Sequence, residues 1–522
     1  MKRMKLTKAG RCVIFLVLIA LLSGGVFALF KTGVIKMPDN KKTVISQNTK
    51  KDKATNTSKP TSNGSMEMSI SLDEWIGWKS IIDANGGLTT QPGSIYDELG
   101  LKLNISIIND GDQSSTAVIK GDLDGAGYTV NRYAFLLNKF KENNTDVVMP
   151  FITNYSNGGD GVITKTNINS VEDLVGKKIG VPRFSEGHTL IAWLVKNSDL
   201  SEDEQKQIID NLVMFDTPDD AATAFFAGEL DAAATWQPYL SQAMETTGCK
   251  ILFDTSNATN LVLDGIAFNA DYVKTNKKAV ETFIKGALMA EDMYTTEFTP
   301  IKNSMSLFAT ETNENIVAMT EDANLATYNN NIELLSSTAQ LVFEDMSNIW
   351  LSLGETAYPE EAANVFDDQT ILALKDEFEA LDTKTPAFTE EQRQEAQKVD
   401  NTQALLKKSV TINFQPNSAL FADQNEAAAA LNEFVKIAKI LDGSIIQVEG
   451  NIYDTGEGDN EAGRALSLQR AKMVAKYLQN QGIDPSRFVI IGNGITKQIG
   501  DNSTEEGKQM NRRTDIMFKV LE

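Results

Sequence analysis

Histidine and cysteine are scarce in this chain of 522 residues, which contains one histidine and two cysteines. So few imidazole and thiol groups exclude a disulfide scaffold, a zinc site built from Cys and His, and an iron–sulfur cluster held by this chain alone. One histidine leaves no candidate for a Ser-His-Asp triad beyond chance, and no spacing among the 71 acidic residues selects a catalytic carboxylate pair. We therefore predict a protein that is not an enzyme, with no catalytic residue, metal site or cofactor.

Glycine and proline, at 35 and 12 residues, are too sparse for a collagen-like or low-complexity polymer. The hydrophobic fraction of 42% and the charged fraction of 23% are those of ordinary globular proteins. The length predicts about three or four domain-sized units. Positive charge is in deficit, because the formal net charge is −22. Such a chain repels phosphate backbones, so nucleic acid is not an expected partner.

The deficit of positive charge does not extend to the amino terminus. Residues 1–66 hold thirteen Lys or Arg and two Asp or Glu, a net of +11, which leaves −33 for the remainder. A basic segment, residues 1–11, is followed by the uncharged and mostly apolar residues 12–30. As a helix, that run spans about 28 Å, close to the hydrocarbon thickness of a bilayer. We predict a cytoplasmic segment over 1–11 and a transmembrane signal anchor over 12–30, with the bulk of the chain extracytoplasmic at the cell membrane.

Whether this anchor is retained stays open at the level of the sequence. Val26-Phe27-Ala28 has the small-residue spacing of a signal-peptidase site, whereas Leu29 and Phe30 extend the apolar run to spanning length, which favours retention. Residues 31–66 are rich in Lys, Thr, Ser and Asn and read as a disordered basic linker. The linker is either a solvated spacer or a segment that lies against anionic lipid or wall polymers.

Residues 67–385 alternate short strand-like runs with longer helical patterns. Residues 103–108 are apolar at every second position, which indicates a strand, and residues 147–151 and 178–181 are similar. Residues 221–227 look helical, and Gly228 is placed to end that helix. This alternation predicts an α/β region with a largely parallel sheet.

The order of motifs in this region is more specific than any one of them. SVEDLVGKKIGVP (170–182) reads as a short helix, a turn and a strand. FSEGHTLIAWLV (184–195) predicts a loop and a helix, with Ser185 as N-cap and His188 in the first turn. The free N–H groups at such a helix start suit a carboxylate, sulfonate or phosphate. TPDDAATAFFAGELDAAATWQPY (217–239) reads as helix, turn and buried strand, with Trp236 at the carboxyl end of that strand, where open α/β sheets bind ligands.

Together with WIGWKS (75–80) and GGDGVITK (158–165), these motifs resemble the periplasmic-type solute-binding proteins of nitrate, sulfonate and taurine transport systems, over residues 68–380. The resemblance implies a two-lobe, periplasmic-binding-protein-like α/β domain with a hinge and a small ligand trapped between the lobes. It implies that residues 150–161 carry the first crossing between the lobes, and that an ABC-type permease or a sensor is the partner.

The ligand-binding residues implied by the resemblance come from both lobes and from the crossing: Trp75, Trp78, Gly159, Asp160, Ser185, His188 and Trp236. Each has a structural alternative, since the tryptophans could pack in a core, His188 could cap a helix and Asp160 could be a turn residue. The class of ligand stays open. An anion suits the helix start, but no arginine in these motifs is placed to clamp one, and the indoles could stack on an apolar or cationic ligand instead.

The carboxyl-terminal region begins after a polar linker over residues 386–408. Residues 409–522 predict a small α+β domain, with strands over 409–414, 445–450, 488–492 and 515–520 and helices over 425–441 and 466–478. NFQPNSALF (413–421), VEGNIYDTG (448–456), the step LSLQRA (466–471) and the terminal NRRTDI (511–516) make this region similar to the OmpA-like peptidoglycan-binding domains.

That family holds the diamino acid of a peptide stem with one aspartate and one arginine, because an ammonium group seeks a carboxylate and a carboxylate seeks a guanidinium fork. Arg470 falls on the arginine position. Tyr453 falls on the aspartate position and Asp454 follows it, so either Asp454 substitutes through a shifted loop or wall binding is weakened. The predicted peptidoglycan-binding residues are Asp454 and Arg470. Arg512 and Arg513 have a structural alternative.

These parts combine into one prediction: a membrane-anchored extracytoplasmic solute-binding protein, tethered to the cell wall by a C-terminal α+β OmpA-like domain. The alternative is a cell-envelope scaffold that links membrane and peptidoglycan and has lost solute binding.

Overall fold

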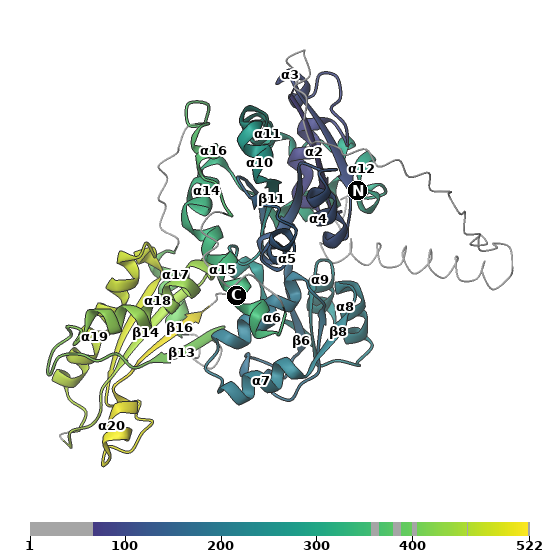
Figure 1. Cartoon of the computed structure of the whole chain (residues 1–522). Coiled ribbons are helices and arrows are strands. Elements are labelled where there is room, and N and C mark those ends of the chain that lie inside the picture. Colours follow the sequence, from purple (N-terminus) through teal and green to yellow (C-terminus); the bar gives the residue numbers. More distant parts are fainter. Residues whose placement is uncertain (1–65, 356–364, 379–387, 399–403, 457, 520–522) are drawn as a thin grey trace, which may run out of the picture.

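The computed structural model describes residues 66–355, 365–378, 388–398, 404–456 and 458–519. Three sheets, of seven, five and four strands, organise these residues into two lobes and a C-terminal domain (Figure 1). The predicted membrane segment, residues 12–30, lies outside the described residues. Among those that are described, no helix is both long and apolar enough to cross a bilayer.

The first lobe is built on the seven-stranded sheet, whose order is β12-β5-β11-β3-β1-β2, with β4 paired to β11. Its strands are β1 (Met66–Leu72), β2 (Leu101–Ile107), β3 (Gly125–Thr129), β4 (Val147–Val148), β5 (Ile152–Ser156), β11 (Leu263–Asn269) and β12 (Ala323–Leu325). The predicted strand at 103–108 is confirmed as β2, in which buried and exposed residues alternate. The sheet is mixed rather than largely parallel, because β1 runs parallel to β2 and β3 whereas β11 is antiparallel to β3 and β5.

Helices cover this sheet and end where the sequence offers caps. For example, the carboxylate of Asp110 caps the start of α4, and Gly121 follows its last residue with φ of 74°. The helices are α2 (Lys79–Asn85), α3 (Ile95–Glu98), α4 (Gly111–Lys120), α5 (Val130–Glu142), α10 (Ala270–Thr275), α11 (Lys277–Met289), α12 (Thr299–Ser304), α13 (Asn313–Asp322), α14 (Tyr328–Glu333), α15 (Ala339–Ser352) and α16 (Gln369–Leu372). A 3₁₀ turn, η1 (Ile76–Trp78), connects β1 to α2.

The second lobe contains the five-stranded sheet, in the order β10-β6-β9-β7-β8. Its strands are β6 (Asp160–Lys165), β7 (Ile179–Pro182), β8 (Leu212–Phe215), β9 (Ala232–Trp236) and β10 (Cys249–Asp254), and its helices are α6 (Glu186–Asn197), α7 (Glu202–Asp210), α8 (Pro218–Phe226) and α9 (Tyr239–Glu245). The predicted helix before Gly228 is α8, and Gly228 follows with φ of 84°, a conformation that favours glycine.

The chain crosses between the lobes twice, from β5 to β6 and from β10 to β11, and the two crossings are bonded to each other. The Thr255 hydroxyl lies 2.8 Å from the Ser156 hydroxyl and accepts a hydrogen bond from the Gly158 N–H at 2.9 Å. The first crossing falls within the predicted segment 150–161. Two adjacent, mutually bonded crossings form the narrow connection that a hinge requires.

The C-terminal domain has the sheet order β13-β16-β14-β15, with β14 and β15 parallel and the other pairs antiparallel. Its elements are α17 (Glu390–Lys398), β13 (Leu406–Val410), α18 (Gln424–Ile440), β14 (Ile445–Asn451), α19 (Glu461–Asn480), β15 (Phe488–Gly494), α20 (Glu505–Asn511) and β16 (Thr514–Lys519). The first strand lies earlier than the predicted 409–414. Beyond Val410 the chain leaves the sheet, and Phe414 instead bridges to Phe421.

The C-terminal domain docks on the second crossing and on the second lobe. The Asp442 carboxylate accepts hydrogen bonds from the Thr259 hydroxyl at 2.6 Å and the Thr259 N–H at 3.0 Å, and the Asn260 side chain donates to the Lys439 carbonyl at 2.8 Å. A Cβ added to Gly443 would lie 2.8 Å from the Ser256 carbonyl oxygen, so only glycine fits this approach. Strand β13 lies beside α6 (Figure 1).

Candidate functional site

Three neighbouring strands place polar side chains in one row across the first-lobe sheet. Asp264 on β11 is the cross-strand partner of Thr129 on β3 and of Asn154 on β5. Asp264 is an isolated acid in an otherwise apolar strand, and its side chain is almost fully buried, at 3% exposure. Since Thr129 ends β3 and the first crossing follows β5, the row lies at the edge of the sheet that faces the second lobe.

The second lobe meets this row through the start of α6. Glu186, the first residue of that helix, accepts a hydrogen bond from the Thr129 hydroxyl at 2.6 Å. One turn further, the Asn131 amide donates to the Thr189 hydroxyl at 3.0 Å. The helix start therefore brings Glu186 beside the row that contains Asp264.

Two indoles flank the first crossing. The Trp75 indole N–H donates to Asn154 Oδ1 at 3.1 Å, and a Cβ added to Gly159 would lie 3.5 Å from the Trp75 ring. Asp160 opens β6 opposite Trp236 on β9, and its carboxylate accepts from the Ser156 hydroxyl at 2.8 Å. Four of the predicted ligand residues, Trp75, Gly159, Asp160 and Trp236, thus lie together where the lobes meet.

Four carboxyl groups gather at this junction: Asp73, Asp160, Glu186 and Asp264. Burial, and next the negative charge of Glu186, raise the pKa of Asp160 to about 7. Burial is also the main reason that the pKa of Asp73 rises to about 6, although the Trp78 N–H bonded to Asp73 opposes the shift. Burial together with the charges of the other three raises the pKa of Asp264 well above its usual range.

Sequence reasoning found Asp160 but missed the other three acids. The Asp73 side chain is exposed to solvent, but the surrounding protein still desolvates its carboxyl group enough to raise its pKa. The available signals were an acid directly after a buried strand for Asp73, an acid at a helix start for Glu186, and a lone acid inside the apolar run of β11 for Asp264. None of them indicates that the groups meet.

The remaining predicted residues lie around the junction in supporting positions. Trp78 is a core residue at 1% exposure, which reaches the junction only through its bond to Asp73. Ser185 caps α6 by accepting from the His188 N–H and donates to the Pro182 carbonyl at 2.6 Å. His188 is buried edge-on against Trp350 with no hydrogen-bond partner for either ring nitrogen. Burial, and secondarily Arg183, lower its pKa to about 4, so it is neutral at pH 7.

Two cavities can be described, and both lie away from these residues. One of about 10 Å³ is lined by Phe151, Thr153 and Ala326 among others. The other, a hollow of about 540 Å³, lies over Gly176, Asn211 and Leu230 of the second lobe. At the junction itself, hydrogen bonds from α6 hold the two lobes against each other.

A second candidate site lies on the C-terminal domain around Arg470. Its guanidinium stacks over the Phe414 ring at 4.8 Å and donates from Nε to the Ser418 carbonyl at 3.1 Å. Arg512 stacks on the Tyr453 ring at 4.9 Å. Burial, and then the charge of Arg512, lower the pKa of Arg470. These contacts hold two guanidinium groups close to one another with aromatic faces beneath them.

Asp454, the predicted partner of Arg470, makes its recorded contacts within its own loop. Its carboxylate accepts from the Gly456 N–H at 2.8 Å, and its own N–H donates to Asn502 at 3.3 Å, so it shapes the loop. No ion pair links it to Arg470 in the part of the chain that the structure describes. Tyr453, rather than Asp454, is the side chain that shares the site with Arg470 and Arg512.

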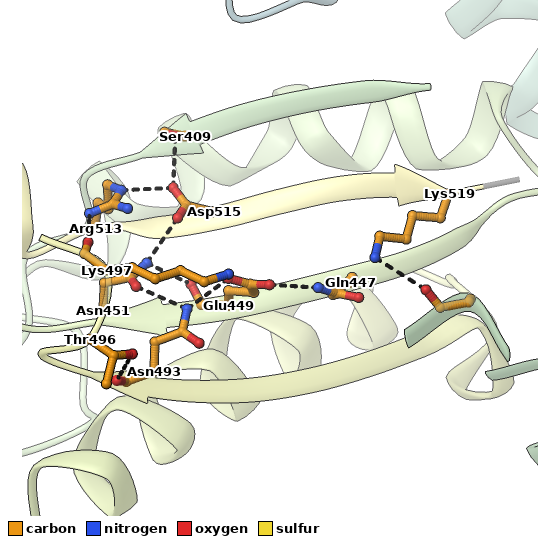
Figure 2. A network of polar contacts seen from close by, with 11 residues as sticks. Ser409, Gln447, Glu449, Asn451, Asn493, Thr496, Lys497, Arg513, Asp515 and Lys519 are labelled. Atoms are coloured by element: carbon orange, nitrogen blue, oxygen red, sulfur yellow. Dashed lines mark hydrogen bonds and ion pairs between the residues drawn. The ribbon is translucent and has the colours of Figure 1, made fainter. Parts of the chain in front are cut away.

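Arg513 belongs to a buried network on the sheet, shown in Figure 2. Its Nε donates to Asp515 at 2.9 Å, and Asp515 also accepts from Ser409 at 2.7 Å and from Asn451 at 3.0 Å. The neighbouring Glu449 accepts from Asn493 at 2.7 Å. The structural interpretation of Arg513 therefore agrees with its contacts, whereas Arg512 lies at the candidate site.

No group of three or more His, Cys, Asp or Glu side chains in the described ranges is arranged to hold a metal ion. The four junction carboxyls are not grouped in that way. They come from four separate parts of the chain: the loop after β1, β6, the start of α6, and β11.

Comparison with protein families identifies two matching regions. Residues 94–295 match the family described as NMT1/THI5 like, and residues 413–512 match the OmpA family. Over the C-terminal region the chain is 36% identical, across 112 residues, to the probable lipoprotein YiaD of Escherichia coli. This match covers 20% of this chain and 50% of that protein. It is 37% identical, across 67 residues, to the peptidoglycan-binding protein ArfA of Mycobacterium tuberculosis, which covers 13% of this chain and 21% of that protein. The chain therefore spans half or less of the length of these relatives.

Among solved structures, the chain is similar to the periplasmic aliphatic sulphonate binding protein SsuA from Escherichia coli, at 15% identity and a TM-score of 0.46, covering 57% of this chain and 97% of that one. It is also similar to the periplasmic nitrate-binding protein NrtA from Synechocystis, at 12% identity and a TM-score of 0.45, covering 61% of this chain and 90% of that one.

Proposed function

Starting from a chain that carries an NMT1/THI5-like domain over residues 94–295 and an OmpA-family domain over residues 413–512, we propose a cell-envelope solute-binding protein with a wall-binding module. The protein captures a small solute between its two lobes and delivers it to an ABC-type permease or reports it to a sensor. Residues 12–30 anchor it in the membrane, and the C-terminal domain attaches it to peptidoglycan.

The observation that carries the solute-binding part is the meeting of predicted residues from both lobes at one place. Trp75 comes from the first lobe, Asp160 from the first crossing and Trp236 from the second lobe, and all three lie at the junction. Polar groups from both lobes that converge beside a double crossing are what a hinge-closing binding protein needs, because closure then completes the site.

The wall-binding part is supported by the geometry around Arg470. A guanidinium fork stacked on an aromatic ring recognises a carboxylate in a fixed plane, and the peptide stems of peptidoglycan present such groups. The similarity of this region to ArfA, a peptidoglycan-binding protein, is in keeping with this assignment.

The proposal is tested on the full chain in detergent micelles by thermal unfolding against a panel of small anions, amines and sulfonates. A ligand at 100 times its Kd stabilises the folded protein by about 2.7 kcal/mol. The stabilisation should disappear in Trp75→Ala and persist in Met214→Ala, an exposed apolar control on the second lobe. A panel that stabilises neither the wild type nor the control contradicts solute binding.

The alternative, an envelope scaffold without a solute, is favoured by one observation. The lobes are bonded directly through Glu186 with Thr129 and through Asn131 with Thr189. A scaffold predicts that Thr129→Ala and Asn131→Ala leave the separation of the lobes unchanged in solution, whereas a binding protein opens when these contacts are removed. X-ray scattering of the full chain distinguishes the two outcomes.

A further inference from the structure

The proposed function leaves the class of solute undefined, and the charges at the junction bear on it. We infer that the interlobe site takes a small organic cation that carries an ammonium group, and not a sulfonate or nitrate. The inference rests on the proposed function and concerns the same site.

The geometry of the junction is acidic from every side. Asp264 lies between Thr129 and Asn154 on the sheet, Glu186 is bonded to Thr129, and Asp160 opens β6 beside the Trp75 ring. These acids come from both lobes and from the crossing, so a ligand trapped there would face carboxyl groups whichever lobe it first contacts. An anion would meet repulsion from each of these groups that is ionised, whereas a cation would favour their ionised forms.

Asp264 provides the second observation. Its side chain is 97% buried, and among the described residues the one hydrogen-bond donor assigned to its carboxyl group is the Trp75 indole N–H, which it shares with Asn154, 3.1 Å from that N–H. A carboxylate has about four acceptor positions, so a buried one is normally surrounded by donors or paired with a cation. Trp75 fills at most one of these positions, and no other donor from the described residues is assigned to Asp264, so a ligand can fill the rest.

Basic side chains near the junction are bound elsewhere. Arg132 donates to the Phe184 carbonyl and stacks on Phe135 at 5.3 Å, and Arg183 pairs with Glu355 at 3.9 Å. None of the ion pairs recorded for the described ranges includes Asp73, Asp160, Glu186 or Asp264. A sulfonate or nitrate would therefore find no guanidinium or ammonium group of the described residues already paired with these acids and placed to receive it.

Two further facts favour an organic ammonium group over a metal ion. The carboxyl groups are not arranged to hold a metal ion, and two indoles, Trp75 and Trp236, flank the acids. An indole face attracts an organic ammonium group, while carboxylates at several distances accept its N–H groups or balance its charge. Both features fit an alkylammonium better than a bare ion.

The test uses the full chain in detergent micelles at pH 7.5 and constant ionic strength, with putrescine, choline, ethanesulfonate and nitrate as probes. Binding is measured by the shift in unfolding temperature and by titration calorimetry. We expect a shift of several degrees with putrescine or choline and none with either anion. Affinity should fall at least tenfold in Asp264→Asn and in Asp160→Asn, which changes a second acid in case the first variant misfolds.

Asp210→Asn is the matched control, because it removes the same charge from an exposed ion pair with Lys206 on α7. The control should bind the ammonium probes as the wild type does. Equal loss in all three variants would indicate a general charge effect and overturn the inference.

Two other outcomes separate this inference from the proposed function. Binding of ethanesulfonate or nitrate that disappears in Trp75→Ala would overturn the cationic ligand and leave solute binding intact. Absence of any shift with all four probes, in protein that unfolds cooperatively, would overturn both.

Discussion

The two candidate sites of this molecule have opposite charge. The interlobe junction gathers Asp73, Asp160, Glu186 and Asp264, whereas the C-terminal site gathers Arg470 and Arg512 on aromatic rings. Among the described residues, no basic side chain forms an ion pair with the junction acids, and none of the recorded ion pairs includes Arg470, whereas Arg512 pairs with Glu505 at 3.3 Å. The comparison teaches that the two sites differ in the sign of the charge they leave unpaired, so the proposed ligands should differ in the sign of the groups that are recognised.

The two sites also differ in how they are built. The C-terminal site depends on one helix, because α19 carries Arg470 and needs only the nearby loops with Phe414 and Tyr453 to complete it. The junction depends on strand order, since Asp264 reaches Thr129 and Asn154 only when β11 is inserted between β3 and β5. We therefore expect the C-terminal site to tolerate changes elsewhere in the fold better than the junction does.

The largest expected effect is on the C-terminal site. Arg470→Ala removes the guanidinium that would bind a stem carboxylate, and we expect retention on purified peptidoglycan to fall by about tenfold or more. Co-sedimentation of the full chain measures this retention. Arg464→Ala is the control, because Arg464 is an exposed arginine on the same helix that pairs with Asp459. Similar losses in both variants would point to non-specific attraction between charges.

A negative charge can be added beside Arg470 and Arg512 by Tyr453→Asp, which puts a carboxylate at the position where the OmpA-like family has one. The variant loses the ring under Arg512 but gains a partner for the ammonium group of the stem. We expect retention on diamino-acid-containing peptidoglycan to rise by about threefold. Weaker retention would mean that Tyr453 itself contacts the wall.

The junction acids predict a pH dependence with a defined sign. The pKa of Asp160 is raised to about 7 in the folded protein by burial and by Glu186, with Asp264 also close and only Ser156 opposing. Between the ordinary carboxyl pKa and about 7, the folded protein therefore binds more protons than the unfolded chain, so this group lowers stability as pH rises through that window.

We accordingly expect Asp160→Asn to gain stability over the wild type as the pH is raised from 5 to 8. The gain should appear as a relative rise of about 2 °C or more in Tm. Calorimetric scans of both proteins in ligand-free buffer measure it, with Asp210→Asn as the charge-matched control. Parallel curves for Asp160→Asn and the wild type would contradict the raised pKa.

The smallest effect is expected for Asp454. Because its carboxylate is bonded to the Gly456 N–H and makes no ion pair with Arg470 in the described residues, Asp454→Ala should change wall retention less than twofold. Co-sedimentation beside Arg470→Ala gives the comparison. A loss as large as that of Arg470→Ala would restore Asp454 to the role that the family pattern gives its aspartate.

Much of the fold was predictable because its signals are local. The alternation in β2, the glycine after α8 and the apolar stripe of α18 each depend on residues within one element. The prediction of a largely parallel sheet in residues 67–385 is wrong for the first lobe, because β11 returns from the second lobe antiparallel to β3 and β5. The strand at 409–414 was placed late because Phe414 pairs with Phe421 instead of continuing the ladder.

The residues of the candidate sites were likewise predictable only where the signal was local. Trp75, Asp160, Trp236 and Arg470 were identified from the order of motifs, and the structure places the first three together. Asp73, Glu186 and Asp264 were missed, since each is one acid among 71 and nothing in its immediate sequence indicates a partner.

The sequence by itself determined which two binding modules the chain contains, in what order, and which helix presents Arg470, because those features are written in short-range patterns. The tertiary structure alone decided that four acids distant along the chain meet between the lobes, and that no basic side chain of the described residues pairs with them. The physical reason is that strand pairing and lobe docking set these contacts, and both depend on interactions between segments far apart in sequence.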